Sequence, residues 1–268
     1  MLAIIKNKMS KIIIQGIKFD EKSSFQKGSR LAPPIIREAL NCGSHNLFAE
    51  NGISIENSMI EDKGDFDISK YFDIEEITRN HIDFNDKIFT LGGDHSITFP
   101  IIKAIHKEYS VLDILHIDAH ADLYDKYEDD KYSHACPFAR IMEHGLAARL
   151  VQVGIRTLNT YQEEQAKKYN VEIHQMKNLD LSKIPRFNNP LYISLDMDGF
   201  DPAFAPGVSH PEPGGLSSRQ VIDIIQSIKT EVIGADITEY NPNRDFQKMT
   251  AFLAAKMMKE IIGKMMEK

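Results

Sequence analysis

The stretch "VLDILHIDAHAD" at residues 111–122 decides the fold. Its first half is an apolar run rich in β-formers, which is typical of a strand buried on both faces of a parallel sheet. Its second half places Asp118, His120 and Asp122 at alternate positions, and alternate side chains of an extended backbone point to one side. Because chemistry in open parallel sheets gathers beyond the carboxyl ends of the strands, this stretch predicts a core strand that leads into a functional edge.

Apolar runs of the same kind recur along the chain and alternate with helical patterns. The runs begin at Lys11, Lys87, Val111, Arg149, Val171, Leu191 and Glu231. The helical patterns are "PPIIREAL", "SITFPIIKAIHKEY" with an expected cap at Ser96, "SSRQVIDIIQSI" with a cap at Ser217 or Ser218, and "TAFLAAKMMKEIIGKMMEK" with a cap at Thr250. This alternation predicts an α/β fold with a parallel sheet covered on both faces, in one domain over residues 1–268. Residues 41–66 and 124–134 are too polar for a core, so we expect surface loops there.

The composition restricts the classes of partner. The formal net charge is −7 and no basic block occurs, which argues against a nucleic-acid ligand. The two cysteines, Cys42 and Cys136, are far apart and form no metal-binding pair, which argues against a disulfide framework or a thiolate zinc site. The opening apolar run is shorter than a signal-peptide core, and no stretch reaches the length of a membrane span. We therefore expect a soluble cytoplasmic protein without a membrane partner.

Ligand-type side chains occupy three of the predicted strand ends. They are Asp94 and His95 in "LGGDHS", Asp118, His120 and Asp122 in "LHIDAHAD", and Asp196, Asp198 and Asp201 in "SLDMDGFDP". Taken singly, such residues are usually turn or capping residues, or satisfied interior histidines. Taken together, they are expected to converge at one edge of the sheet.

Four converging carboxylates need positive charge among them. Unit charges ~4 Å apart interact by roughly 4 kcal/mol at an effective dielectric of ~20. Protons could relieve the repulsion by raising pKa values, but the flanking histidines favour metal ions, and two divalent cations cancel four carboxylates. Oxygen and imidazole ligands without a thiolate suit Mn²⁺, with Co²⁺, Ni²⁺ and Fe²⁺ as alternatives. Two such ions sharing a water would lower its pKa and supply a nucleophile.

Several motifs in this chain resemble those of the ureohydrolases, the family of arginase, agmatinase and their relatives. They are "GGDHS" at 92–96, "DAHAD" at 118–122, "SHACPF" at 133–138, "SLDMDGFDPAFAPG" at 194–207, and the later "PEPGGL" and "DITEYNP". They follow the family order over nearly the whole chain. The resemblance implies a three-layer α/β/α arginase-like fold around a central eight-stranded parallel sheet, assembled as a homotrimer or homohexamer.

The resemblance also implies roles for individual residues. One Mn²⁺ would be held by His95, Asp118, Asp122 and Asp196, and a second by Asp118, His120, Asp196 and Asp198. Asp118 and Asp196 would bridge the two ions. Glu239 would bind the guanidinium of a small guanidino substrate through parallel N–H bonds. His134 would shuttle protons to the leaving amine, and Asp236 could support the site from behind.

The sequence favours agmatine as the substrate, which would be cleaved to putrescine and urea, with arginine as the alternative. The Asn-bearing stretches with which animal-type arginases hold the amino-acid end of arginine have no counterpart in "ADLYDKYEDDKYSH" at 121–134. This segment and "APGVSHPEPGGLSSR" resemble the plant-type arginase and bacterial agmatinase branch instead. His210 is expected to touch the substrate tail or to cap a turn before Pro211.

Two other classes of function were weighed against a ureohydrolase. A metallophosphoesterase is also a binuclear metallohydrolase, but it would require a "GNH" motif and further histidines that this chain lacks. A non-catalytic metal-binding protein would not need Glu239 and His134 beside a full ligand set. The sequence therefore predicts a hydrolase that releases urea and an amine.

Overall fold

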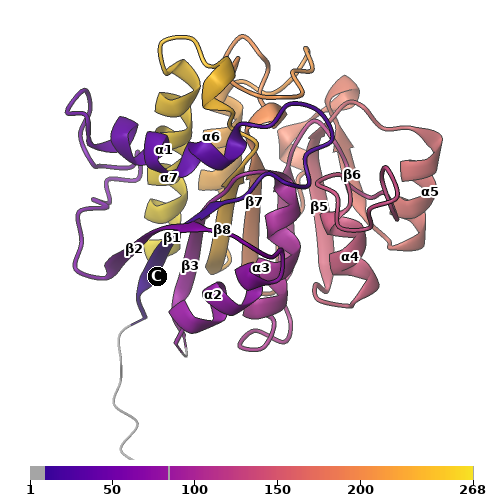
Figure 1. The fold of residues 1–268 in the computed structure, drawn as a ribbon, viewed down its shortest axis with the longest axis horizontal. Coiled ribbons are helices and arrows are strands. Elements are labelled where there is room, and N and C mark those ends of the chain that lie inside the picture. The colour runs from indigo at the N-terminus through magenta and orange to yellow at the C-terminus, as the bar shows by residue number, and fades with distance from the viewer. Residues whose placement is uncertain (1–9, 84, 268) are drawn as a thin grey trace, which may run out of the picture.

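One parallel sheet organises the molecule, a computed structural model that describes residues 10–83 and 85–267 (Figure 1). The short apolar run at the start of the chain, on which the prediction of a cytoplasmic location partly relied, lies outside the described residues. Within them the sheet has eight strands in the order β2-β1-β3-β8-β7-β4-β5-β6. The strands are β1 (Ile12–Lys18), β2 (Ile60–Asp67), β3 (Lys87–Leu91), β4 (Asp113–Ile117), β5 (Arg149–Ile155), β6 (Glu172–Gln175), β7 (Leu191–Asp196) and β8 (Val232–Thr238). All neighbours pair in parallel, which confirms the predicted sheet.

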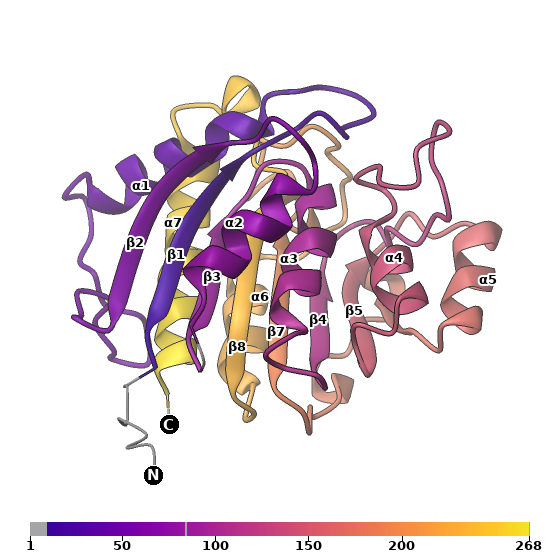
Figure 2. The same ribbon diagram turned by 60° about the horizontal axis from the view of Figure 1, so that its bottom comes forward.

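Helices cover both faces of this sheet. They are α1 (Ala32–Asn41), α2 (Asp73–His81), α3 (Thr98–Ile105), α4 (Pro137–Glu143), α5 (Thr160–Lys168), α6 (Ser218–Ser227) and α7 (Met249–Met266). Helices α1, α6 and α7 share one hydrophobic core, and α2 to α5 contribute to a second one. Figure 2 shows α2, α3 and α4 in front of the sheet, with α6 and α7 behind it. Among the described helices, none combines the length and apolar character that a membrane span requires.

Strand β1 illustrates why the core strands read as continuous apolar runs. Ile12 and Ile14 lie in the core beneath α1 and α7, whereas Ile13 and Ile17 lie in the core beneath α2 and α3. All four side chains are at most 5% exposed. Each such burial contributes about 1.5 to 3 kcal/mol, so strands β1, β3, β4, β7 and β8 are held from both sides.

Strand β2 corrects the expectation that residues 41–66 form loops throughout. Its sequence "IEDKGDFD" is mostly charged, and its side chains alternate between partly buried and exposed. It pairs only with β1, at the edge of the sheet. An edge strand pairs with one neighbour only and tolerates charged side chains. A prediction based on apolar runs therefore misses it.

The helix caps match the sequence in one case and differ in two. Ser217 caps α6 in a capping box with Gln220, as predicted. Helix α3 begins at Thr98, after a 3-10 turn that Asp94 caps, so Ser96 is not its cap. Helix α7 begins at Met249, before Thr250, so Thr250 is not its cap, and the Thr250 hydroxyl accepts a hydrogen bond from the Gly207 amide at 2.8 Å.

The strand order brings four strand ends side by side. Strands β3, β8, β7 and β4 are consecutive neighbours in the sheet, and the residues that follow or end them include His95, Glu239, Asp196 and Asp118. Gly93 allows the loop after β3 to approach β1 closely, because a Cβ there would lie 1.8 Å from the Phe19 carbonyl oxygen. The site is therefore built at the centre of the carboxyl edge.

Candidate active site

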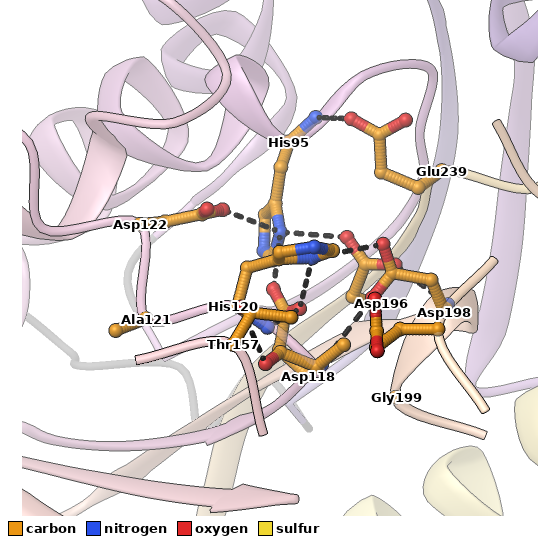
Figure 3. Close-up of polar contacts among 12 residues, drawn as sticks. His95, Asp118, His120, Ala121, Asp122, Thr157, Asp196, Asp198, Gly199 and Glu239 are labelled. Carbon is orange, nitrogen blue, oxygen red and sulfur yellow. Dashed lines mark hydrogen bonds and ion pairs between the residues drawn. The ribbon is translucent and has the colours of Figure 1, made fainter. Parts of the chain in front are cut away.

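His95 lies at the centre of a buried carboxylate cluster (Figure 3). Its Nδ1 is 2.9 Å from Asp196 Oδ2, 3.2 Å from Asp118 Oδ2 and 3.3 Å from Asp122 Oδ2. This nitrogen is buried and makes no hydrogen bond. Three carboxylate oxygens around one unbonded ring nitrogen form a set of atoms that a cation can bind.

The hydrogen bond made by Nε2 sets the tautomer of His95. His95 Nε2 lies 2.9 Å from the Ser194 hydroxyl, and that hydroxyl donates to Asp236 Oδ1 at 2.7 Å. Since the Ser194 proton goes to Asp236, Ser194 accepts from His95 Nε2–H, and a neutral His95 presents the lone pair of Nδ1 to the cluster. Asp236 also accepts hydrogen bonds from Tyr192 and Thr98, so it supports the site from behind, as expected.

A second group of ligand atoms lies on the other side of Asp118. His120 Nδ1 is 3.1 Å from Asp198 Oδ2 and 3.4 Å from Asp118 Oδ1. Backbone amides hold the carboxylates in place: His120 N donates to Asp118 Oδ1 at 2.6 Å, and Asp198 N donates to Asp196 Oδ1 at 2.7 Å. Asp118 thus contacts both histidines, and all six predicted ligand residues come together.

The donor atoms fit divalent cations. Ligand atoms of His95, His116, Asp118 and Asp122 lie within 4.8 Å of one another, as do those of Asp118, His120 and Asp198. Burial and the carboxylates of Asp198 and Asp118 raise the pKa of Asp196 well above its usual range. Burial likewise raises the pKa of Asp198 to about 6, against the opposing effect of His120. The cluster therefore gathers carboxylates whose negative charge burial disfavours, and divalent cations bound there would supply the compensating positive charge.

His116 belongs to the site although the sequence analysis did not select it. Its Nε2 lies 2.7 Å from Asp118 Oδ2, and its ring stacks on Phe138. Gln152 Nε2 donates to the Ala121 carbonyl at 2.6 Å and lies 3.0 Å from His116 Nδ1. Because Gln152 is a donor there, Nδ1 accepts and Nε2–H donates to Asp118. His116 alternates with Asp118 along β4, and that spacing was the available signal.

Glu239 and His134 form a pair above the cluster. Glu239 Oε1 accepts from the His95 backbone amide at 2.9 Å, which Figure 3 shows, and lies 2.9 Å from His134 Nδ1. Burial lowers the pKa of His134, but the Glu239 carboxylate outweighs it, and the pKa is raised to about 9. Both side chains are buried, as is Ser133, so the expectation that residues 124–134 are surface loop is wrong at its last two residues.

The loop after β1 reaches His134 from the other side. The Ser24 hydroxyl lies 2.8 Å from His134 Nε2, and the Ser24 amide lies 3.2 Å from the same atom. The backbone of His134 donates to the Lys22 carbonyl at 3.2 Å. No local pattern in the sequence marks Ser24, because it meets His134 only through the fold.

A cavity of about 220 Å³ opens between these groups. Its lining includes Ser24, His120, Asp122, Tyr124, Tyr127, His134, Thr157, Gln162, Asp196, Asp198, His210 and Glu239. His210 is half-buried, with its ring centroid 5.2 Å from that of His134 and 6.0 Å from that of His120. This position lets His210 face a molecule bound in the cavity.

Two candidate acids lie outside the cluster. Asp94 accepts hydrogen bonds from the amides of Lys22 and Ser96, which makes it a turn and capping residue. Asp201 accepts from the amides of Ala203, Gly214 and Gly215. For these two residues the structural interpretation is correct.

The fold and the cluster define a class of metal-binding hydrolases, and comparisons with known proteins name it. The model of the arginase family matches residues 10–263. The mitochondrial arginase of Medicago truncatula is 42% identical over 93% of this chain and 80% of its own length. The N(1)-aminopropylagmatine ureohydrolase of Thermus thermophilus is 35% identical over 90% of this chain and 87% of its own. The solved structure of the Medicago truncatula arginase superposes with a TM-score of 0.90 and 40% identity, covering 96% of this chain and 87% of that one.

The chain belongs to the arginase family, whose members are binuclear metal enzymes that hydrolyse guanidino C–N bonds. This confirms the predicted resemblance, fold and enzyme class.

The expected cytoplasmic location is wrong by the same comparison. The Medicago truncatula arginase is named mitochondrial, which points to an organelle rather than to the cytoplasm. The expectation relied in part on the cysteines. Cys42 and Cys136 are indeed both free. Two free thiols do not identify the compartment of a protein.

Proposed function

We propose that this protein hydrolyses the guanidino group of L-arginine to urea and ornithine. The observation that carries the choice of substrate is the 42% identity to a plant arginase over 93% of the chain. The 35% identity to the aminopropylagmatine enzyme is lower. The substrate preferred from the sequence motifs, agmatine, therefore becomes the second candidate.

The six clustered ligand residues would hold two Mn²⁺ ions. His95, Asp118, Asp122 and Asp196 would bind one ion, and Asp118, His120, Asp196 and Asp198 the other. Nitrogen and oxygen donors without a thiolate support Mn²⁺ as the metal. When bound, such a pair makes a water acidic enough to act as a nucleophile near neutral pH.

Glu239 would receive the substrate. A carboxylate accepts parallel N–H bonds from a planar guanidinium, which fixes the carbon over the cluster. The contact of Glu239 with the His95 backbone supports this role, because it ties the guanidinium site to the metal site. Asp118, which lies between His95 and His120, would contribute to both metal ions of the catalytic centre, as would Asp196.

His134 would carry protons to the leaving nitrogen. A water oxygen bonds to the guanidinium carbon, the C–N bond to the amine breaks, and both water protons end on the amine, which leaves as an ammonium. A pKa of about 9 keeps His134 charged near neutral pH, so it can donate at this step. Ser24 holds His134 Nε2 from the solvent side.

One observation supports agmatine as the second candidate. None of the described residues that line the cavity is Lys or Arg, the side chains that bind a carboxylate most strongly. Agmatine lacks the α-carboxylate of arginine and so needs no such partner. His210 would contact the substrate tail in either case.

Urea release by the Mn²⁺-loaded protein tests these assignments. We expect kcat/KM for L-arginine to exceed that for agmatine, and the reverse order would establish agmatine. Guanidinobutyrate and proclavaminate complete the panel, and formimidoylglutamate is followed through formamide. The absence of hydrolysis with every substrate would overturn the proposed function.

We further propose that residues 1–268 form one ureohydrolase domain and that it assembles as a homotrimer or homohexamer. Support for one domain comes from the sheet, which takes strands from Ile12 to Thr238. Light scattering gives the mass of the assembly, and limited proteolysis tests the single domain.

A further inference from the structure

Three ligand-type side chains meet above the carboxylate cluster. His134, His210 and Glu239 can each offer one ligand atom such that these atoms lie within 4.8 Å of one another. They come from the loop after β4, the loop after β7 and the end of β8. We propose that this trio is a third cation site, which binds Zn²⁺ and thereby excludes the guanidino substrate.

The chemistry of the donors distinguishes this trio from the metal cluster below it. Two imidazoles and one carboxylate form the ligand set of open zinc sites, in which water occupies the fourth position. The cluster offers two imidazoles among four carboxylates, a harder set that suits Mn²⁺. Zn²⁺ added to the Mn²⁺-loaded protein therefore has a softer site of its own.

The ligand atoms of the trio lie within 4.8 Å of one another, so His210 would have to approach the other two to complete a zinc site. His134 Nδ1 and Glu239 Oε1 are 2.9 Å apart, and two ligands of a tetrahedral zinc are about 3.3 Å apart for bonds of ~2.0 Å. The rings of His134 and His210 are tilted by 40°, with centroids 5.2 Å apart. Binding releases the proton that His134 shares with Glu239, so each zinc bound frees one proton from a charged His134.

The charges at the cavity also allow a cation here. Glu239 is a fifth carboxylate, beyond the four that neutralise two divalent ions in the cluster, and its partner in the structure is His134 Nδ1 at 2.9 Å, so zinc would bind between this carboxylate and the imidazole. That carboxylate is the one that would hold a guanidinium. Zn²⁺ and guanidinium therefore compete for the same carboxylate, and zinc occupancy also removes His134 from proton transfer.

Equilibrium dialysis of the Mn²⁺-loaded protein against zinc chloride tests the site, with both metals counted by mass spectrometry. We expect one zinc ion beyond the retained manganese pair, and guanidinium chloride should displace it. His210→Ala should weaken this zinc about tenfold or more, since even indirect partners of a metal site change affinity by that factor. His174→Ala, on edge strand β6, is the matched control and should bind as the wild type.

Zinc that merely replaces manganese one for one would overturn the proposal, as would an additional ion that survives His210→Ala. If that variant does not fold, anomalous diffraction at the zinc edge of the wild-type protein decides between the trio and the cluster. The inference rests on the proposed function only for its kinetic consequence, a raised KM for the guanidino substrate. A protein that binds the third zinc but releases no urea would refute the function and retain the site.

Discussion

The metal cluster differs in construction from the mouth of the cavity, which is the group formed by Ser24, His134, His210 and Glu239. In the cluster, His95, Asp118 and Asp196 follow or end strands β3, β4 and β7, and backbone amides hold the carboxylates. At the mouth, the chain brings together Ser24 and His210 from separate loops. Strand ends thus position the candidate metal ligands, whereas loops contribute Ser24 and His210 to the cavity, where sequences can vary without loss of the scaffold.

Both regions include residues with left-handed backbone. Asp122 in the cluster has a φ of 50°, and Glu239 at the mouth has a φ of 61°. Such a conformation costs a residue other than glycine about 1 kcal/mol or more. Both residues present a carboxylate to the cavity, so the surrounding contacts must hold this conformation.

The largest expected effect is in the cluster. Asp196→Asn removes a carboxylate that contacts His95 Nδ1, and we expect kcat/KM to fall about a thousandfold, equivalent to ~4 kcal/mol of transition-state stabilisation. Urea release in excess Mn²⁺ measures the loss. Asp201→Asn, which changes an acid outside the cluster, is the control. Equal losses in both variants would contradict the placement of Asp196 in the functional cluster and of Asp201 outside it.

Glu239→Gln tests whether the mouth can fail while the cluster stays intact. We expect kcat/KM to fall about thirtyfold to a thousandfold, because the guanidinium loses its carboxylate. This factor corresponds to a loss of roughly 2 to 4 kcal/mol of transition-state stabilisation. The manganese content should stay at the wild-type value. Loss of manganese together with activity would place Glu239 within the metal site instead.

His116→Leu removes a donor that lies behind the cluster. We expect Mn²⁺ affinity to weaken about 10- to 100-fold, since Asp118 loses its hydrogen bond from His116 Nε2. Competition with a chelator measures the affinity. His116→Gln can still donate and should recover part of the loss. Unchanged affinity in His116→Leu would make His116 a packing residue.

Ser24→Ala should have a smaller effect at the mouth. The variant loses one hydroxyl bond to His134 Nε2, worth about 1 kcal/mol, and kcat/KM should fall about fivefold. Ser23→Ala is the matched control, because the Ser23 hydroxyl points to Asp94 at 3.5 Å. The same loss in both variants would indicate a disturbed loop rather than a lost contact.

The stability of the metal-free protein should also depend on pH. Burial lowers the pKa of His134, but Glu239 raises it to about 9, above the ordinary value near 6.5 of the unfolded chain. The stability gained from this pair is therefore complete below about pH 6.5 and is lost as the pH rises through 9. Urea denaturation of wild type and Glu239→Gln should show a difference that shrinks over this range. A constant difference would contradict the pairing.

Much of the cluster was predictable because its signals are local. Asp118 and His120 alternate at the end of one apolar run, and Asp196 and Asp198 at the end of another. Parallel strands expose their carboxyl ends at one edge, so these motifs had to lie on the same side of the sheet. His116 shares this alternation, but a histidine within an apolar run is usually interpreted as a core residue, so the sequence pattern does not select it.

Other features had no local signal. Strand β2 is charged, so its place became apparent only through its pairing with β1. The contact of Ser24 with His134 joins residues 110 positions apart. His134 lies in a polar segment that predicts exposure. In the fold it is buried, and its ring contacts Glu239.

By itself, the sequence predicted the alternation of strands and helices and the two-sided core, and it placed six candidate ligand residues after or at strand ends, because these features depend on spacings of a few residues. Only the tertiary structure decided the order of the strands, the hydrogen bond of His116 and the meeting of His134, His210 and Glu239. Those features depend on distances between segments far apart in the chain, and these distances are set when the sheet and its loops pack.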